Sequence, residues 1–172
     1  QESGSINSAM FTMAMAKRRG DEITVQLPDT QIRIWNLDDP DPKQNPILLS
    51  GHTEQITALA FSPDGRWFAS SSLDDTIQLW DRKKDSNFAT KPIVLRGHSL
   101  NIVTIAFSQD GHWLVSASLD QTARLWDLTV PDPNTHIIEL VGHSKAIQAI
   151  ALSSDSQWLA TSGIDFSVRL WD

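Results

Sequence analysis

Tryptophan recurs along this chain at a nearly constant interval, and this regularity constrains the fold more than any other feature. Four of the seven tryptophans stand 45 or 46 residues apart, at Trp35, Trp80, Trp126 and Trp171. Gly-His pairs follow the same interval, at Gly51-His52, Gly97-His98 and Gly142-His143. A period of this length is typical of repeat architectures, in which each copy buries its apolar surface against the next copy. The chain is therefore expected to be an array of similar units.

Four residue types keep a fixed spacing inside the three later repeats. An Asp follows each of these His residues by 22 positions, a Trp follows the Asp by 6, and a hydroxyl residue precedes the Asp by 4. The twelve positions are His52, Ser70, Asp74, Trp80, His98, Ser116, Asp120, Trp126, His143, Thr161, Asp165 and Trp171. The length varies only between a Trp and the next His, which indicates a packed repeat joined by a loop.

Each repeat is predicted to contain four short strands. In the second repeat the expected strands are residues 56–62, 66–72, 76–81 and 92–96, separated by Gly, Pro and Asp turn signals. The first of these strands has apolar side chains on both faces, such as Ile56 and Leu59. Such a strand is buried on both faces, so the sheets must be stacked as propeller blades are. The expected fold class is all-β, with about four blades of four antiparallel strands in a half or partial β-propeller.

The Gly-His opening, the period and the closing Trp-Asp resemble the WD-repeat β-propeller family. Three repeats carry this pattern in full, over residues 51–81, 97–127 and 142–172. The repeat at residues 7–36 is degenerate, because Asn7 replaces the His and Val25 replaces the hydroxyl residue. The segment SPDGRWFASSSLDDTIQLWD and the Asp-Pro-rich loops also resemble bacterial propellers of multidomain signalling proteins, often behind an NTPase module.

The resemblance implies one propeller segment over residues 1–172. The expected blades are residues 7–50 (degenerate), 51–96, 97–141 and 142–172, and the last lacks its fourth strand. An open arc of this kind would expose apolar blade faces. Three arrangements are open: the chain is an excerpt of a longer propeller, two copies join head to tail, or a different chain completes the ring. Self-association or additional blades are therefore expected.

The resemblance implies that the recurring His, hydroxyl, Asp and Trp residues form a buried structural network in each blade. His98, Asp120 and Ser116 also match the residue types of a hydrolase triad. An active site occurs once in a chain, whereas this set occurs three times, so the structural interpretation is preferred. No catalytic residues and no enzymatic activity are expected.

Composition excludes several classes of protein. The chain has no Cys, which removes disulfide scaffolds, thiolate metal sites and Cys nucleophiles. Its net charge of −7 argues against nucleic-acid binding. It contains no Gly-rich phosphate loop, no membrane-spanning apolar run and no signal peptide. His112 and His136 each stand apart from other candidate metal ligands, so neither indicates a metal site. We expect a cytoplasmic protein with no cofactor, no metal and no membrane association.

A second set of tryptophans, Trp67, Trp113 and Trp158, follows the same period. Two interpretations are open for them. They either form a row of aromatic docking points or cover the neighbouring blade, and the second interpretation is preferred because three copies in register indicate packing.

An apolar surface is predicted where the turn before each recurring Asp meets the start of the first strand. Its candidate residues are Leu73, Leu100, Leu119, Ile164 and Phe166, rimmed by the polar residues Glu54, Asn101 and Lys145. Exposed contiguous apolar surface marks interaction sites. The alternative is that these apolar side chains pack into the adjacent blade, and the sequence leaves both interpretations open.

The function predicted from these features is a non-catalytic scaffold or sensor that presents propeller-face loops to a protein or peptide partner. The alternative is a propeller domain of an enzyme or of a STAND-type NTPase signalling protein, with a small-ligand site in the central channel. For that channel the innermost strands offer only Thr57, Thr104 and Gln148, which is a weak polar lining.

Overall fold

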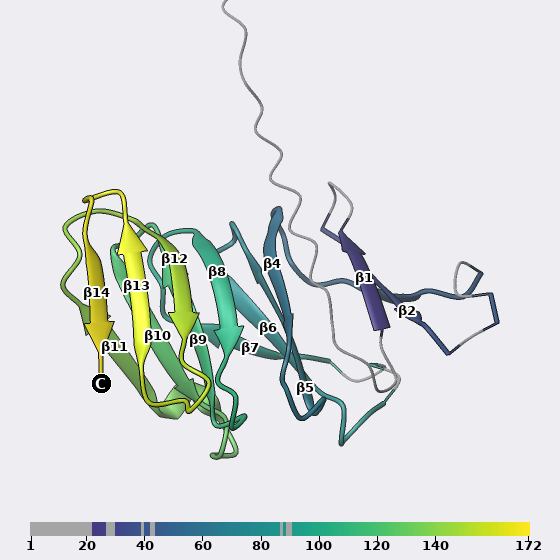
Figure 1. Ribbon diagram of the computed structural model, residues 1–172. Coiled ribbons are helices and arrows are strands. Elements are labelled where there is room, and N and C mark those ends of the chain that lie inside the picture. Colours follow the sequence, from purple (N-terminus) through teal and green to yellow (C-terminus); the bar gives the residue numbers. More distant parts are fainter. Residues whose placement is uncertain (1–21, 27–29, 39, 42–43, 87, 89–90) are drawn as a thin grey trace, which may run out of the picture.

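The computed structural model describes residues 22–26, 30–38, 40–41, 44–86, 88 and 91–172. This part of the chain folds into four antiparallel sheets that stand side by side in chain order (Figure 1). Its regular structure is β-strand apart from one short 3-10 helix, η1 (Pro133–Thr135), and none of its helices is long and apolar enough to cross a membrane. The all-β fold class of repeated antiparallel blades is confirmed.

Strands that are consecutive in the chain are hydrogen-bonded neighbours in each sheet. The first sheet contains β1 (Glu22–Gln26), β2 (Ile32–Asn36) and β3 (Ile47–Leu49). The second contains β4 (Ile56–Phe61), β5 (Trp67–Ser72), β6 (Thr76–Asp81) and β7 (Ile93–Arg96). The third contains β8 (Ile102–Phe107), β9 (Trp113–Ser118), β10 (Thr122–Asp127) and β11 (Ile137–Val141). The fourth contains β12 (Ile147–Leu152), β13 (Leu159–Gly163) and β14 (Val168–Trp171).

The strands of the second sheet begin and end within one residue of their predicted bounds. The turn between β4 and β5 shows why they end there. The Ser62 hydroxyl donates to Asp64 Oδ1 at 2.6 Å and accepts from the Trp67 backbone N–H at 2.8 Å. Gly65 completes the turn with φ = 69°, a left-handed conformation that glycine adopts without steric cost. The first strand expected in the degenerate repeat lies outside the described residues.

A β-bulge interrupts the innermost strand of three sheets. The register between β4 and β5 shifts between Ile56 and Ala58, and β8 and β12 carry the same shift. The residues within the three shifts are Thr57, Val103 and Gln148. Thr104, which the sequence grouped with the channel residues, instead pairs with Ala117. The grouping was wrong because Thr57 and Gln148 follow the His of their repeat by five positions, whereas Thr104 follows His98 by six, so the equivalent residue is Val103.

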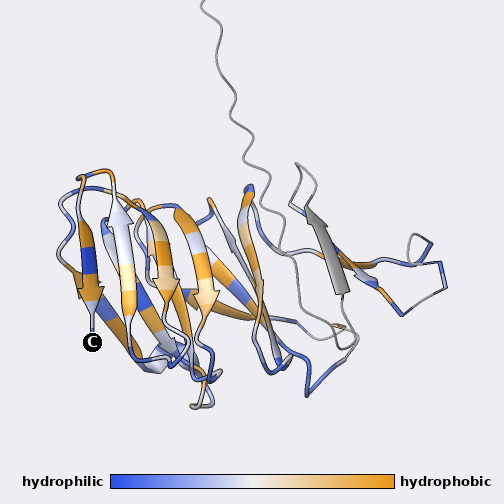
Figure 2. Cartoon of the chain, viewed as in Figure 1, coloured by the Kyte–Doolittle hydropathy of each residue, from blue (hydrophilic) through white to orange (hydrophobic). Residues whose placement is uncertain are grey.

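Apolar side chains fill the space between consecutive sheets. Ile77, Leu79 and Leu95 of the second sheet form one cluster with Leu114 and Trp126 of the third sheet. All five side chains are buried. Figure 2 shows that apolar residues concentrate on the strands, whereas the connecting loops are mainly polar. The sheets are therefore held together by their faces, as the two-sided apolar pattern predicted.

An aromatic group fills the space between the first and second sheets. Phe68 lies at the centre, with its ring centroid 5.4 Å from that of Trp80 and 5.9 Å from that of Phe88. Ile32 and Ile34 of β2 belong to the same buried cluster. The two interfaces thus use the same strand positions with different side chains.

The second set of tryptophans differs in exposure from sheet to sheet. Trp67 is 5% exposed and packs in the cluster between the second and third sheets, while Trp113 is half-buried. Trp158 of the fourth sheet is 45% exposed. The position of Trp67 supports the packing interpretation.

One polar side chain joins the third sheet to the edge of the second. Asn134, in η1, accepts from the Arg96 backbone N–H at 3.1 Å and donates to the Val94 carbonyl at 3.2 Å. The Asn134 amide thereby satisfies a donor and an acceptor on the outer edge of β7, where unpaired backbone groups invite pairing with other chains.

Candidate functional site

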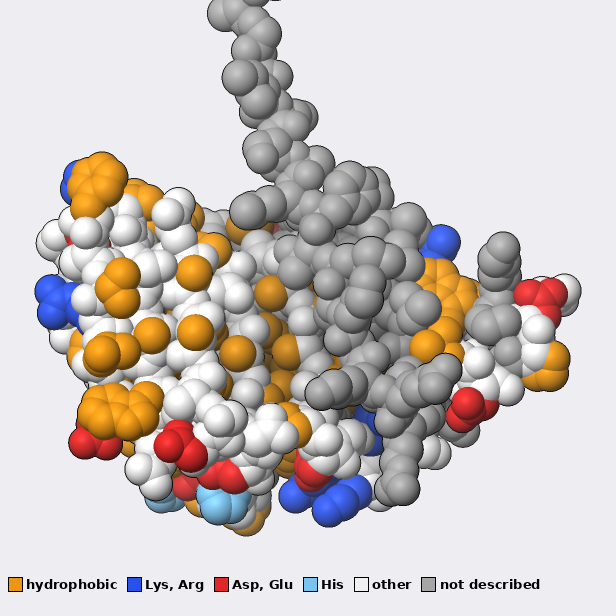
Figure 3. Space-filling model, in the orientation of Figure 1, with side chains coloured by type: hydrophobic (Ala, Val, Ile, Leu, Met, Phe, Trp, Pro, Cys, Tyr) orange, Lys and Arg blue, Asp and Glu red, His pale blue; other side chains and the backbone are white. Residues whose placement is uncertain are grey.

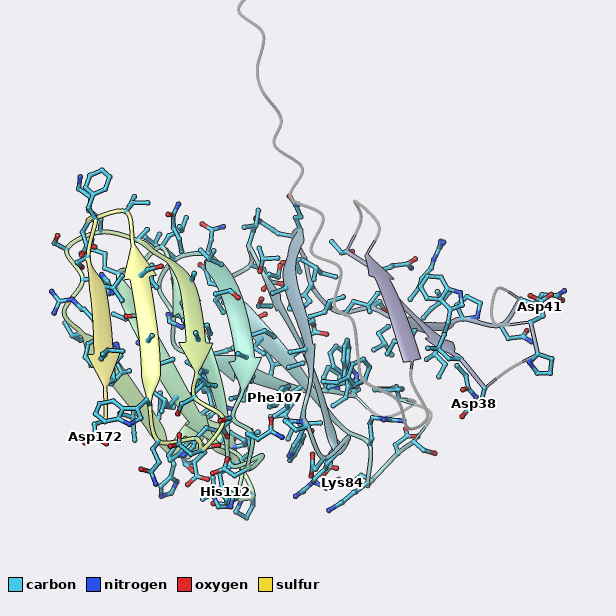
Figure 4. The ribbon with its side chains drawn as sticks, in the orientation of Figure 1. Asp38, Asp41, Lys84, Phe107, His112 and Asp172 are labelled. Atoms are coloured by element: carbon cyan, nitrogen blue, oxygen red, sulfur yellow. The ribbon has the colours of Figure 1, made fainter. Side chains whose placement is uncertain are left out.

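The recurring residues gather at one end of the sheets, which we call the upper rim. It consists of the residues before the first strands of three sheets (52–55, 98–101 and 143–146) and the turns after their second strands (73–75, 119–121 and 164–166). The beginnings of β4, β8 and β12 lie in that order along the upper side of Figure 1. Figure 4 places Phe107, His112 and Lys84 at the opposite, lower end.

The third sheet holds the complete predicted chain of hydrogen bonds. His98 Nδ1 lies 2.8 Å from Asp120 Oδ2, and His98 Nε2 lies 2.8 Å from Ser116 Oγ. The Trp126 indole N–H donates to Ser116 Oγ at 2.9 Å. Because a carboxylate only accepts, Nδ1 carries a proton, and the Ser116 hydroxyl can donate to a neutral Nε2 while accepting from the indole. Each buried polar group thus has a partner.

The fourth sheet repeats this arrangement. His143 Nδ1 lies 2.8 Å from Asp165 Oδ2, His143 Nε2 lies 2.9 Å from Thr161 Oγ1, and the Trp171 indole donates to Thr161 at 3.0 Å. Threonine can replace serine here because the network uses only the hydroxyl group.

The second sheet lacks one of the expected links. His52 lies 2.9 Å from Asp74 Oδ2 and 2.8 Å from Ser70 Oγ. Among the hydrogen bonds of the described residues, however, none joins Trp80 to Ser70. Phe68 lies opposite Trp80 on the adjacent strand, whereas a leucine lies opposite the equivalent Trp in the third and fourth sheets. The Trp80 ring packs on Phe68 instead.

The structure adds a hydroxyl residue to each network that the sequence analysis missed. The residues two positions after each recurring Asp are Thr76, Thr122 and Ser167, and their hydroxyls donate to the carboxylate at 2.6, 2.7 and 2.8 Å. A hydroxyl residue two positions after the Asp in all three repeats could have been recognised from the sequence. This residue matters because it donates to the carboxylate oxygen that the His does not contact.

The carboxylates of the networks are held in their ionised form. Burial raises the pKa of Asp120, but hydrogen bonds from His98 and Thr122 outweigh burial and hold that pKa well below its usual range. The pKa values of Asp74 and Asp165 are lowered by the same balance of burial against hydrogen bonds. An ionised carboxylate here accepts strong hydrogen bonds from both the imidazole and the backbone.

Ser116, His98 and Asp120 have the connectivity of a hydrolase triad, but their surroundings do not suit catalysis. Ser116 is 0% exposed, and its oxygen already accepts a hydrogen bond from Trp126. A substrate carbonyl cannot reach an oxygen enclosed in this way. Within the described ranges, no group of three or more His, Cys, Asp or Glu side chains is placed to hold a metal ion.

Most of the apolar candidates on the upper rim are exposed. Leu100 is 48% exposed, Leu119 41%, Ile164 42% and Phe166 97%. Leu73 is half-buried rather than exposed, so it contributes less to the apolar surface than the sequence analysis predicted. Hydrophobic side chains also reach the surface over the β12–β14 sheet in Figure 3.

The polar candidates on the rim differ in their surroundings. Glu54 and Lys145 are exposed. Asn101 is half-buried, and its amide donates to the Leu73 carbonyl of the neighbouring sheet at 3.0 Å. Asn101 therefore joins two sheets at the rim in addition to bordering the apolar surface.

The His98→Ala substitution is expected to lower the free energy of unfolding by about 3–5 kcal/mol, because it leaves a buried carboxylate without its partner. Chemical denaturation at neutral pH measures this change. The matched control is His112→Ala, because the His112 side chain is 62% exposed at the lower end. Equal stability of the two variants would contradict a structural role for the network.

Acid is expected to destabilise the protein through these carboxylates. Because their pKa values are lowered on folding, their contribution is complete above about pH 4 and is lost as the pH falls towards the folded pKa. The Asp120→Asn variant should therefore lose stability less steeply than the wild type below about pH 4, as measured by urea unfolding. Glu54→Gln, which removes an exposed carboxyl group on the rim, is the matched control for the loss of one carboxyl group.

The sequence of three segments, residues 43–81, 90–127 and 134–172, matches the family model of the WD domain, G-beta repeat. A WD40 repeat-containing protein of Dictyostelium discoideum is 40% identical over 62 residues, which cover 36% of this chain and 9% of that protein. The Denticleless protein homolog of Danio rerio is 31% identical over 91 residues, covering 51% of this chain and 14% of that protein. The probable cytosolic iron-sulfur protein assembly protein Ciao1 of Culex quinquefasciatus is 46% identical over 57 residues, covering 32% and 17%.

This chain thus spans less than a fifth of the length of these relatives. All three relatives come from eukaryotes, so the resemblance to bacterial propellers stays a prediction. The matched segments cover more than half of the chain, and the described residues form sheets of the predicted kind. The chain belongs to the WD-repeat family.

Proposed function

We propose that this protein is a non-catalytic scaffold that binds a protein or peptide partner on its upper rim. WD repeats imply a protein-interaction role. The observation that carries the proposal is the exposure of Leu100, Leu119, Ile164 and Phe166 at one end of the sheets. Exposed apolar surface that gathers at one end of a molecule is typical of interaction sites.

The backbone around these residues supports a binding role over a packing role. Phe166 has φ = 63° and is almost fully exposed, while the equivalent turn residues Asp75 and Gln121 have φ = 64° and 74°. A bulky residue in the left-handed region is uncommon, whereas Asp is tolerated there. Neither folding nor burial accounts for an aromatic ring at this position. A partner that covers the ring would account for it.

Part of the rim is exposed although a neighbouring sheet lies beside it. Leu100 and Leu119 belong to the third sheet, which has neighbours on both sides. Gln121, equivalent to Phe166, is also exposed although the fourth sheet lies beside it. In the second sheet, by contrast, the equivalent residues Leu73 and Asp75 are half-buried.

A further blade of the same kind is proposed to cover the outer face of the fourth sheet. Val168 and Leu170 are 71% and 69% exposed, whereas Ile77 and Leu79, at the same positions of the second sheet, are fully buried against the third sheet. A further blade would therefore cover Val168 and Leu170 as the third sheet covers Ile77 and Leu79.

The Leu119→Asp variant is expected to lose binding without losing stability, because a charge replaces an exposed apolar contact. Random peptides of about twelve residues displayed on phage serve as the probe, and retention on the immobilised protein is the readout. Leu48→Asp is the matched control, because Leu48 is 56% exposed on β3 away from the rim. Peptides retained equally by both variants would show that they bind away from Leu119. An unfolded Leu119→Asp variant would show that Leu119 is needed for packing rather than for binding.

The exposed face of the fourth sheet is expected to make the 172-residue chain self-associate as its concentration rises. The double substitution of Val168 and Leu170 by Asp should favour the 19.2 kDa monomer without changing the thermal midpoint, because both side chains contact solvent. Light scattering over a concentration series measures the mass. A wild-type monomer at all concentrations would show that this face needs no cover.

A further inference from the structure

One position of the upper rim changes its chemistry from sheet to sheet. The second residue after each Gly-His histidine is Glu54 in the second sheet, Leu100 in the third and Lys145 in the fourth. All three side chains are exposed. The rim therefore runs from acidic through apolar to basic across three equivalent positions.

The backbone holds these three positions in equivalent places. The residue before each one donates its backbone N–H to the recurring Asp of the same sheet, from Thr53, Ser99 and Ser144 at 3.0, 3.1 and 3.0 Å. The carbonyls of Glu54 and Leu100 also accept from Ser72 and Ser118. Because β4, β8 and β12 follow one another along the rim, Leu100 stands between the acidic and the basic position (Figure 1).

The turn residues reinforce this order. The residue after each recurring Asp is Asp75 in the second sheet, Gln121 in the third and Phe166 in the fourth. The acidic end thus has two carboxyls, Glu54 and Asp75. Among the rim residues of the fourth sheet, 143–146 and 164–166, the charge outside the network is that of Lys145. The exposed side chain of Leu119 lies in the turn between these ends.

We propose that the upper rim selects peptide segments by a charge order and binds them in one direction. The segment has a basic residue at one end, apolar residues in the middle and an acidic residue at the other end. The basic end lies at Glu54 and Asp75, the apolar residues lie on Leu100 and Leu119, and the acidic end lies at Lys145. This inference rests on the proposed function, since it specifies the partner of the same surface.

Charge complementarity is the physical basis of this selection. Complementary charges at a binding site contribute mainly to specificity and orientation, and like charges brought together oppose binding. Each exposed pair is expected to change the affinity by about two- to fivefold, since exposed ion pairs contribute little in water. The preference should weaken in about 0.5 M NaCl, whereas apolar contacts should not.

The test is a selection from the same displayed peptide library on four forms of the chain: the wild type, Glu54→Lys, Lys145→Glu and the double exchange. Peptides recovered on the wild type should carry a basic residue at one end and an acidic residue at the other. Glu54→Lys leaves Asp75 in place, so the charges at that end balance and the preference for a basic residue there should be lost. Lys145→Glu should recover peptides with two basic ends. The double exchange should recover peptides with one basic end, bound at position 145, and with no charge preference at the other end.

Synthetic copies of the recovered peptides then measure the effect. The affinity of a wild-type peptide should fall by about two- to fivefold for each single charge reversal. Lys84→Glu and Asp38→Lys change the net charge equally but lie away from the rim, and they should leave the affinity unchanged (Figure 4). These controls separate local complementarity from the effect of net charge.

The outcomes separate the inference from the proposed function. Peptides that need Leu119 but show no preference for end charges would overturn the charge order and leave the scaffold function standing. Peptides whose preference follows the control substitutions as strongly as the rim substitutions would also overturn it. Recovery of no peptide that depends on Leu119 would overturn both.

Discussion

The blades of this protein carry apolar side chains on both faces, so each is stable only where neighbouring sheets cover it. Ile77 and Leu79 of β6 pack towards the third sheet, while Trp80 of the same strand packs towards the first. This division follows from the alternation of side chains along a strand. Stacking in turn fixes the order of the sheets and brings equivalent loops together at one end. The proposed binding surface therefore depends on the contact between faces, although its exposed apolar residues lie outside the buried clusters between the sheets.

The buried networks give the three sheets the same backbone conformation at the upper rim, while the exposed side chains there differ from sheet to sheet. In each of three sheets a His, an Asp and a hydroxyl residue tie the turn after the second strand to the segment before the first. All polar groups of such a network must be satisfied, because a half-satisfied network is costly inside a protein. Once the backbone is fixed, the adjacent exposed positions are free to vary. Glu54, Leu100 and Lys145 show this freedom.

Sequence reasoning located the strands of the second sheet within one residue, because turn residues such as Asp64 and Gly65 mark where a strand must end. It also identified the His, hydroxyl and Asp residues that the structure brings together. It missed the second hydroxyl residue of each network, although that residue stands two positions after each recurring Asp. It misplaced Thr104, which stands one position beyond Val103, the residue equivalent to Thr57 and Gln148. The missing bond of Trp80 depends on Phe68, which lies opposite it in the sheet.

The sequence by itself determined the repeat, the strand positions of the second sheet, and the His, the Asp and the first hydroxyl residue of each network, because these follow from a period and from fixed spacings along one chain. Only the tertiary structure decided which apolar side chains remain in contact with solvent. Leu73 and Leu119 occupy equivalent turns, yet Leu73 is half-buried and Leu119 is exposed. The neighbouring sheet places Asn101 beside the Leu73 backbone. Exposure depends on what a neighbouring sheet brings to a position, and no spacing within one repeat contains that information.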